Sequence, residues 1–252
     1  MSTLRRSFSK FLDPADVATL VSTFRQEGYQ GLQLKGAQYT AYLAEPERAL
    51  EELGSDPGIY SAVITGDSID DEGRERIRRT IDFAAGVGAE RIVFCHGHPH
   101  DGVDAAQRRE FAQTLTEIAR ESVDRGVAFS LHHHTDQPVM VLEDFREFFD
   151  GLEPGVLGLT VDTAHLARSG IADLPAFIDE FGPFVDNLHL KDYTRATDEW
   201  RLFGEGDLDL TGVLDALDRA GYAGWLCVDE ESAASLPEGL SRSRDWLDRH
   251  GR

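Results

Sequence analysis

Short apolar runs rich in β-branched residues alternate with longer amphipathic stretches along the whole sequence. Eight of these runs have the length and composition of β-strands: 4–9, 31–34, 60–65, 91–96, 127–133, 157–162, 185–190 and 224–229. The stretches after them have helical spacing: 14–27, 46–54, 69–87, 104–124, 140–151, 171–181, 211–220 and 238–248. Strands that alternate with helices pair in parallel through right-handed crossovers. Eight such units in 252 residues predict a single α/β domain over 1–252, folded as a (β/α)8 TIM barrel.

Glycine-bearing turns join several helical stretches to the next strand, as in QEGYQG, GVGAERI, DRGVAF and RAGYAGW. Glycine readily adopts the left-handed conformation that ends a helix, so these turns are typical of repeated βα units. The alternative fold is a doubly wound open sheet with a glycine-rich phosphate loop. The sequence has neither GxGxxG after its first strand nor GxxxxGK[ST] anywhere, which favours the barrel.

The net charge of −21 restricts the partners of this chain. It repels phosphate backbones and anionic lipids, so we expect neither nucleic acid nor a membrane as a partner. Only 3 lysines accompany 22 arginines, against 46 acidic residues. An acidic surface with few lysines is what we expect of a halophilic protein, because high salt screens the repulsion between its charges. An arginine-rich, GC-biased genome is the alternative explanation.

The two cysteines indicate the cellular compartment, because disulfides are rare in the reducing cytoplasm. Cys95 and Cys227 lie far apart in separate strand-like runs, so we expect reduced thiols in the core rather than a disulfide. The N-terminal stretch MSTLRRSFSKFLDPAD lacks the apolar segment of a secretory signal, and no run reaches the ~18 apolar residues of a membrane span. These features predict a cytoplasmic protein. The oligomeric state stays open, a homo-oligomer included.

Histidines gather at one end of the predicted barrel. Eight of the nine follow or end the fourth to seventh strands: His96, His98, His100, His132, His133, His134, His165 and His189. The carboxyl ends of barrel strands carry the active site in enzymes of this fold. The same rim carries charged residues, namely Asp162, Lys191, Asp192, Asp229, Glu230 and Glu231. Imidazole and carboxylate together predict a site for a divalent cation such as Mn²⁺, Co²⁺, Zn²⁺ or Fe²⁺.

Strand alternation narrows the set of inward-facing residues. His132 and His134 share one face of their strand, as do His189 and Lys191, while His133 points the other way. Structural roles are the alternatives. One alternative is that Asp162 is merely the N-cap of the following helix and binds no metal. Another is that the histidines of HGHPH (96–100) lie in a surface loop without a function.

Three stretches resemble the sugar phosphate isomerase/epimerase group of the xylose isomerase-like TIM barrels. VDTAH (161–165) resembles the family's D-T-x-H after the sixth strand, and NLHLKD (187–192) is similar to its H-x-K-D at the seventh. The segment 203–232, from FGEGDLD to LCVDEES, is similar to the family's stretch from a glycine-rich turn to the acidic end of the last strand. The family includes ketose 3-epimerases, inosose dehydratases and, more distantly, AP endonucleases.

This resemblance implies one divalent metal ion, Mn²⁺, Co²⁺, Zn²⁺ or Mg²⁺, held by one side chain from each of the last four strands. Asp162 and His189 match the family's aspartate and histidine ligands. His132 stands where the family has glutamate on the fifth strand. On the eighth strand Asp229 replaces glutamate, with Glu230 as the alternative if the register slips.

The resemblance also implies catalytic roles. The family's two glutamates remove and return a proton beside a carbonyl, through a metal-stabilised enediolate. Here His134 is the candidate base, and Asp229 is a second catalytic group with a shorter reach than glutamate. His165 matches a family histidine that hydrogen-bonds a substrate oxygen.

Three further residues are candidates for substrate binding. Arg195 corresponds to a substrate-contacting arginine in some members, and its planar fork suits hydroxyl, carboxylate or phosphate oxygens. Lys191 either contacts the substrate or is paired within the rim. His96 lies at the end of the fourth strand, where multi-metal relatives have an extra histidine.

The resulting prediction is a metal-dependent isomerase or epimerase acting on a small sugar or keto-polyol. An inosose-dehydratase-like lyase is the first alternative, because the usual pair of glutamates is absent from this sequence. A multi-metal phosphodiesterase and a non-catalytic sugar-binding barrel are the remaining alternatives.

Overall fold

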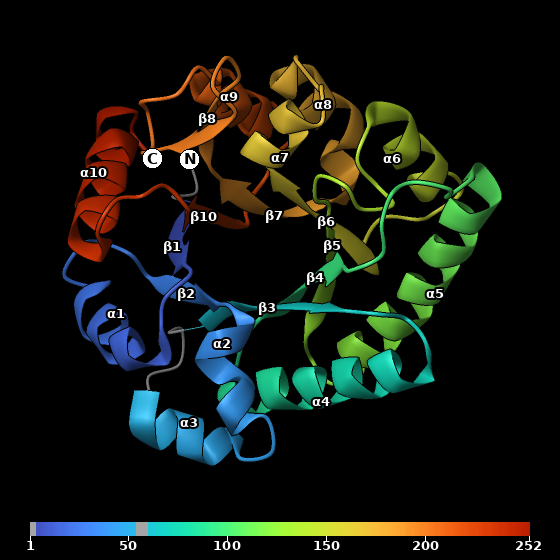
Figure 1. Cartoon of the computed structure of the whole chain (residues 1–252), viewed down its shortest axis with the longest axis horizontal. Coiled ribbons are helices and arrows are strands. Elements are labelled where there is room, and N and C mark those ends of the chain that lie inside the picture. Colours follow the sequence, from blue (N-terminus) through green and yellow to red (C-terminus); the bar gives the residue numbers. More distant parts are fainter. Residues whose placement is uncertain (1–3, 54–59) are drawn as a thin grey trace.

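The computed structural model describes residues 4–53 and 60–252. Eight parallel strands close into a barrel in the order β1-β10-β7-β6-β5-β4-β3-β2, with helices around it (Figure 1). The barrel strands are β1 (Arg5–Lys10), β2 (Gly31–Leu34), β3 (Tyr60–Asp67), β4 (Arg91–His96), β5 (Ala128–His132), β6 (Leu157–Asp162), β7 (Val185–Leu190) and β10 (Trp225–Glu230). The predicted (β/α)8 TIM barrel is confirmed.

The helices form the outer layer. They are α1 (Val17–Thr23), α2 (Gly36–Tyr39), α3 (Pro46–Leu53), α4 (Asp71–Val87), α5 (Ala105–Val123), α6 (Leu142–Phe149), α7 (Thr163–Arg168), α8 (Leu174–Phe181), α9 (Leu210–Arg219) and α10 (Leu236–Arg249), with 3-10 turns η1 (Pro14–Asp16), η2 (Thr40–Tyr42) and η3 (Gly182–Phe184). Side chains that accept hydrogen bonds from the first turn fix where several of them begin, including Asp70, Asp104, Asp173, Asp209 and Ser235. Aromatic rings such as Phe145, Phe177 and Phe181 fill the space between this layer and the barrel.

A short hairpin outside the barrel was not predicted. Strands β8 (Asp192–Thr194) and β9 (Glu199–Arg201) pair antiparallel directly after β7. Tyr193 and Trp200 lie opposite each other in this pair, with ring centroids 5.3 Å apart. The hairpin therefore covers the carboxyl end of the barrel next to the histidines, where Trp200 lies 5.2 Å from the ring of His165.

The barrel interior is polar in its middle and closed at its amino end. Gln33 on β2 donates from Nε2 to Oδ1 of Asn187 on β7, at 2.9 Å. These strands are not neighbours in the barrel, so both side chains point inward. Trp225 fills the amino end, and a Cβ at Gly31 would lie 2.9 Å from its ring, so the side-chain-free glycine lets the ring fit.

Two further sequence expectations concern the thiols and the membrane. Cys95 and Cys227 are both free thiols, as predicted, but only Cys227 is buried in the core, since Cys95 is partly exposed. In the described part of the chain, no helix combines the length and apolar character that crossing a bilayer demands.

Candidate metal centre

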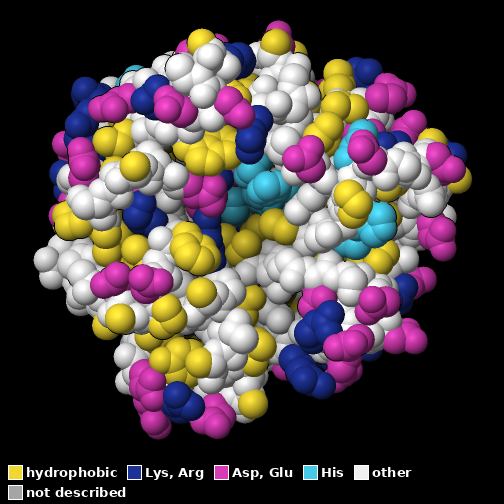
Figure 2. Space-filling model, viewed as in Figure 1, with side chains coloured by type: hydrophobic (Ala, Val, Ile, Leu, Met, Phe, Trp, Pro, Cys, Tyr) yellow, Lys and Arg dark blue, Asp and Glu magenta, His cyan; other side chains and the backbone are white. Residues whose placement is uncertain are grey.

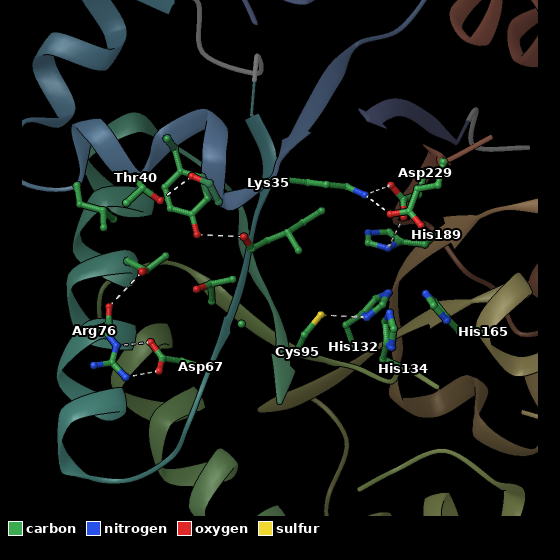
Figure 3. Close-up of a pocket in the computed structure, with 18 of the residues that line it drawn as sticks. Lys35, Thr40, Asp67, Arg76, Cys95, His132, His134, His165, His189 and Asp229 are labelled. Atoms are coloured by element: carbon green, nitrogen blue, oxygen red, sulfur yellow. Dashed lines mark hydrogen bonds and ion pairs between the residues drawn. The ribbon is translucent and has the colours of Figure 1, made fainter. Parts of the chain in front are cut away.

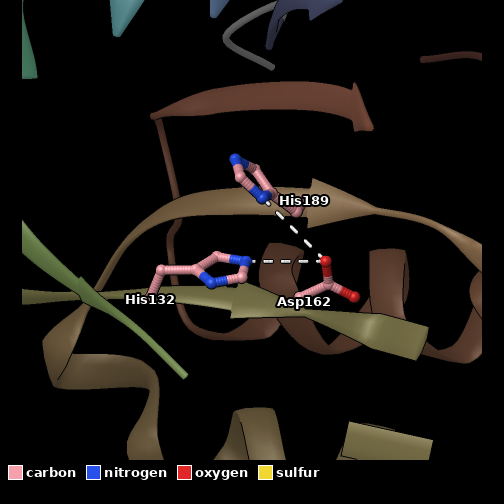
Figure 4. Close-up of side chains that lie close together, drawn as sticks. All are labelled: His132, Asp162 and His189. Carbon is pink, nitrogen blue, oxygen red and sulfur yellow. Dashed lines mark ion pairs between the residues drawn. The ribbon is translucent and has the colours of Figure 1, made fainter. Parts of the chain in front are cut away.

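Three neighbouring strands bring the candidate ligands together at the carboxyl end of the barrel. His132 ends β5 and Asp162 ends β6, and Asp162 is aligned with His189 of β7. One ligand atom from each lies within 4.8 Å of the other two. Oδ2 of Asp162 is 3.6 Å from Nε2 of His132 and 3.9 Å from Nδ1 of His189 (Figure 4). The three side chains that the sequence singled out as ligands therefore lie close together in the structure.

The atoms that face one another in this cluster have no hydrogen-bond partner in the described part of the chain. They are Nε2 of His132, Oδ2 of Asp162 and Nδ1 of His189, and all three residues are buried. Oδ2 of Asp162 does lie 3.2 Å from the ammonium group of Lys191, so the two imidazole nitrogens are the atoms without a partner. Buried polar atoms are nearly always satisfied, so two unpaired nitrogens that face one carboxylate call for an explanation. Two imidazole nitrogens and a carboxylate oxygen are ligands that fit a divalent cation.

The orientation of His189 is set from inside the barrel. Its Nε2 lies 2.8 Å from Oε1 of Gln33, and Nε2 of Gln33 donates to Asn187. Because the amide oxygen of Gln33 can only accept, Nε2 of His189 carries the proton. Nδ1 therefore presents its lone pair to the cluster, as a metal ligand must.

His132 and Asp162 are held in comparable ways. Nδ1 of His132 is 3.2 Å from Sγ of Cys95, which leaves Nε2 facing Asp162. Oδ1 of Asp162 accepts from the backbone N–H groups of Ala164 and His165, both at 3.0 Å, and so caps α7. Asp162 is therefore both an N-cap, through Oδ1, and a candidate ligand, through Oδ2.

Neighbouring charges shift the protonation of the cluster. Burial opposes a charge on His132, but Cys95 and Asp162 outweigh burial and raise the pKa of His132 to about 10. Burial lowers the pKa of His189 to about 3. Burial also opposes ionisation of Asp162, but Lys191 and His165 hold its pKa well below the usual range.

The last strand presents Asp229 to the same place. Oδ2 of Asp229 is 3.8 Å from Nδ1 of His189. Its two oxygens are also paired with lysines, Oδ1 with Lys35 at 2.9 Å and Oδ2 with Lys191 at 2.8 Å. Despite burial, these ammonium groups hold the pKa of Asp229 well below its usual range. Asp229 thus faces the site, and its role as fourth ligand stays a prediction.

Glu230, the alternative fourth ligand, points elsewhere. Its carboxylate pairs with Lys10 and accepts from the backbone N–H of Ser232. A Cβ at Gly239 of α10 would lie 3.0 Å from Glu230, so this side chain lies between the barrel and the helix layer. The strand register therefore favours Asp229.

A cavity of about 520 Å³ opens above the cluster. Histidine side chains gather in the hollow at the centre of this face (Figure 2), and Figure 3 shows His132, His134, His165 and His189 along one side of the cavity. The rings of His134 and His165 have centroids 3.8 Å apart. Nδ1 of His134 is 2.8 Å from the carbonyl oxygen of Thr135, so this nitrogen carries the proton and Nε2 is the basic atom. Burial lowers the pKa of both His134 and His165.

Two predicted substrate-binding residues lie outside the lining of this cavity. His96 points to the opposite side of β4, where its ring packs 4.5 Å from that of Phe111 and borders a separate cavity of about 290 Å³. Arg195 is exposed, and its guanidinium pairs with Asp207 at 2.7 Å. A role for either in binding substrate stays a prediction. Lys191, the third of them, lines the main cavity.

Sequence reasoning missed three residues of the site, namely Gln33, Lys35 and Cys95. Lys35 follows β2 directly, at the same end of the barrel as the histidines, and this position was the available signal. Strand alternation could not choose between Cys95 and His96, because strands of a parallel barrel are buried on both faces. Nothing in the sequence indicated that Gln33 contacts His189.

Comparisons with known proteins agree with the observed fold. A model of the xylose isomerase-like TIM barrel family matches residues 21–250. An inosose dehydratase of Bacillus velezensis is 24% identical over 250 residues, which cover 88% of this chain and 83% of that protein.

Solved structures show the same fold. The IolI protein with a bound zinc atom has a TM-score of 0.78 at 16% identity, covering 96% of this chain and 97% of its own. L-ribulose 3-epimerase also has a TM-score of 0.78, at 15% identity, covering 98% and 94%. With most of its length matched by the family model, the chain belongs to the xylose isomerase-like TIM barrel family.

Proposed function

We propose that this protein is a divalent-metal-dependent isomerase or epimerase that acts on a small sugar or keto-polyol. One observation carries the proposal. Ligand atoms of His132, Asp162 and His189 converge beside a cavity large enough for such a substrate, and the two imidazole nitrogens among them have no hydrogen-bond partner among the described residues. The zinc atom bound to IolI and the sugar named for L-ribulose 3-epimerase support it by analogy of fold.

The cation would be held by His132, Asp162 and His189, with Asp229 as the fourth ligand. Zn²⁺, Mn²⁺, Co²⁺ and Mg²⁺ are the candidates, and the mixed nitrogen and oxygen set suits the first three better than Mg²⁺. When bound, the cation supplies Lewis-acid polarisation of a substrate carbonyl, which acidifies the neighbouring C–H group.

The cavity walls supply the proton-transfer groups. His134 lines the cavity, and its contact with Thr135 leaves Nε2 as a base that can take a proton from the substrate carbon. His165 lies beside it and can hydrogen-bond a substrate oxygen. Lys191 is 3.2 Å from Oδ2 of Asp162, so its ammonium group can stabilise negative charge that develops on a substrate oxygen near the cluster.

A lyase of the inosose dehydratase kind is the second candidate. The observation that favours it is the pairing of Asp229 with both Lys35 and Lys191, because a carboxylate held by two ammonium groups is a poor second base. In a dehydration, His134 would take the α-proton and the Lys191 ammonium would protonate the departing hydroxyl group. The inosose dehydratase relative matches most of this chain.

Isotope exchange separates the two candidates. Metal-free protein is reconstituted with Zn²⁺, Mn²⁺, Co²⁺ or Mg²⁺ and incubated in D₂O with a panel of keto-sugars and inososes. Deuterium incorporation without loss of water supports the isomerase or epimerase, and formation of a dione with release of water supports the lyase. We expect His134→Gln to abolish either reaction and His98→Gln, which removes an exposed histidine outside the main cavity, to leave it unchanged. If no metal gives either deuterium exchange or elimination, both candidates are contradicted.

A further inference from the structure

The three lysines of this chain all lie at the carboxyl end of the barrel. Lys10 ends β1, Lys35 follows β2 and Lys191 follows β7. Each pairs with the acidic run at the end of β10, residues 229–231. The 22 other cationic side chains are arginines, so lysine is confined to this one place. Lysine differs from arginine in being a compact point charge with three separate N–H donors.

Lys35 and Lys191 form a closed ring of ion pairs with two carboxylates. Asp229 bridges them at 2.9 Å and 2.8 Å. Glu231 bridges the same two ammonium groups, with Oε1 2.5 Å from Lys35 and Oε2 2.8 Å from Lys191. All four residues line the main cavity, and Figure 3 shows Lys35 extended across it towards Asp229. Lys10 pairs with Glu230 and is not part of this lining.

The two carboxylates in the ring are not equivalent. Asp229 is on β10, and its side chain is only 4% exposed. Glu231 follows the last residue of β10, and its side chain is 29% exposed. Glu231 is therefore the carboxylate that a ligand can displace more readily, because Asp229 is held in the barrel wall. When Glu231 moves away, it leaves a space between the ammonium groups of Lys35 and Lys191 that fits another carboxylate.

The charge at this end of the cavity favours an anion. With the histidine ligands neutral, as metal binding requires, a divalent cation and two ammonium groups face three carboxylates, those of Asp162, Asp229 and Glu231. One positive charge remains, in a protein whose net charge is −21. Displacing Glu231 adds a second. A local excess of positive charge lining a cavity attracts a negatively charged group of a ligand.

We propose that Lys35 and Lys191 bind a carboxylate of the substrate in the place that Glu231 occupies, so that the substrate is a sugar acid rather than a neutral sugar. The inference rests on the proposed function, because the reacting carbonyl must lie at the metal centre. Lys191 is 3.2 Å from Asp162, so a carboxylate bound between the lysines lies beside that centre. Lys35 is then the residue that distinguishes acids from neutral sugars.

Matched probes test this assignment. Binding of aldonates, the corresponding neutral alditols and alditol phosphates is measured by titration calorimetry, on metal-free and on zinc-loaded protein. We expect the best aldonate to bind at least about tenfold more tightly than its alditol, as for charge-assisted hydrogen bonds in a partly buried site. Lys35→Met should abolish this preference. Glu231→Gln should strengthen aldonate binding about threefold or more by removing the competing carboxylate. Arg109→Met removes one exposed positive charge on α5 and should change nothing.

The outcomes are distinct. A gain in Glu231→Gln cannot come from misfolding, and thermal melts of each variant check that Lys35→Met is folded. Alditols that bind as well as aldonates, no aldonate binding at all, or a preference retained in Lys35→Met would overturn the inference. If alditol phosphates bind more tightly than aldonates, the lysine pair is a phosphate site, and the proposal that it binds a carboxylate is wrong. Zinc binding without the acid preference refutes only this inference, while the preference without zinc binding refutes only the proposed metal centre.

Discussion

Gln33 determines which nitrogen of His189 faces His132 and Asp162. Its amide is fixed by Asn187, and its oxygen accepts from Nε2 of His189 at 2.8 Å. Residues that orient metal ligands in this way commonly contribute about 10- to 100-fold to metal affinity. Asp162, His132 and His189 were singled out from the sequence by their residue types, by their positions at strand ends and by the family resemblance. Gln33 was not, because its role depends on a contact between strands that are distant in the sequence.

The first prediction concerns Gln33. We expect Gln33→Leu to weaken zinc binding about 10- to 100-fold, because Nε2 of His189 loses its acceptor and the ring can change tautomer. Gln33→Glu keeps an acceptor at the same place and should retain the affinity within about threefold. Zinc titrations of both variants, with exposed Gln113→Leu as the control, measure this. Equal affinities in wild type and Gln33→Leu would remove Gln33 from the site.

At the scale of elements, the sequence predicted the barrel well and its additions poorly. Four of the eight predicted strands, 31–34, 91–96, 157–162 and 185–190, coincide with those observed. The hairpin of β8 and β9 and the short helix α7 were missed, and the predicted helix 171–181 begins at Leu174. Barrel strands are apolar runs between clear turns, whereas the hairpin is held by tertiary contacts such as those of Asp192.

Asp192 anchors the loop that follows this hairpin. Its Oδ2 accepts from the backbone N–H groups of Gly204 and Gly206, both at 2.9 Å. A Cβ at Gly206 would lie 2.2 Å from Oδ1 of Asp192, so the approach requires glycine. We expect Asp192→Ala to lower stability by about 2–3 kcal/mol and the melting temperature by roughly 5–10 °C. Zinc affinity should change little, since this carboxylate points away from the cluster. A melting temperature within 1 °C of wild type would contradict the anchoring role.

At the amino end of the barrel, Glu90, which precedes β4, links strands β1 and β10. Its carboxylate accepts two bonds from Arg5 of β1, at 2.5 Å and 2.8 Å, and one from Nε1 of Trp225 at 3.0 Å. Burial opposes ionisation, but Arg5 and Trp225 outweigh it and lower the pKa of Glu90 below 4.5. A lowered pKa in the folded state contributes stability above pH 4.5, and this contribution is lost as the pH falls through the folded-state pKa.

Glu90→Gln should therefore lower the melting temperature at pH 7 by only about 1–3 °C. The side chains of Glu90 and Arg5 are each 43% exposed, so solvent screens their ion pair. The difference from wild type should shrink as the pH is lowered below 4.5. Melting curves between pH 3 and pH 7 check this, with exposed Glu153→Gln as the control. If the melting-temperature difference between wild type and Glu90→Gln grows towards low pH, the pKa of Glu90 is not lowered in the folded protein.

For the whole molecule, the net charge of −21 is the dominant property. Repulsion among exposed carboxylates destabilises the compact state, and raising KCl from 0.1 M to 1 M shortens the screening length from about 10 Å to about 3 Å. If the chain is adapted to high salt, its melting temperature should rise by several degrees over this range. Surface pairs such as Arg219 with Asp179 weaken in salt, so an arginine-rich chain without that adaptation should show a flat or falling curve.

Zinc binding by the intact protein tests the metal centre most directly. Equilibrium dialysis with metal analysis should give one tightly bound zinc ion per wild-type chain. His189→Ala should bind none at the same free zinc concentration and keep its circular dichroism spectrum, while His98→Ala should bind like wild type. Full zinc occupancy in folded His189→Ala, or no zinc in the wild-type protein, would contradict a metal centre formed by His132, Asp162 and His189.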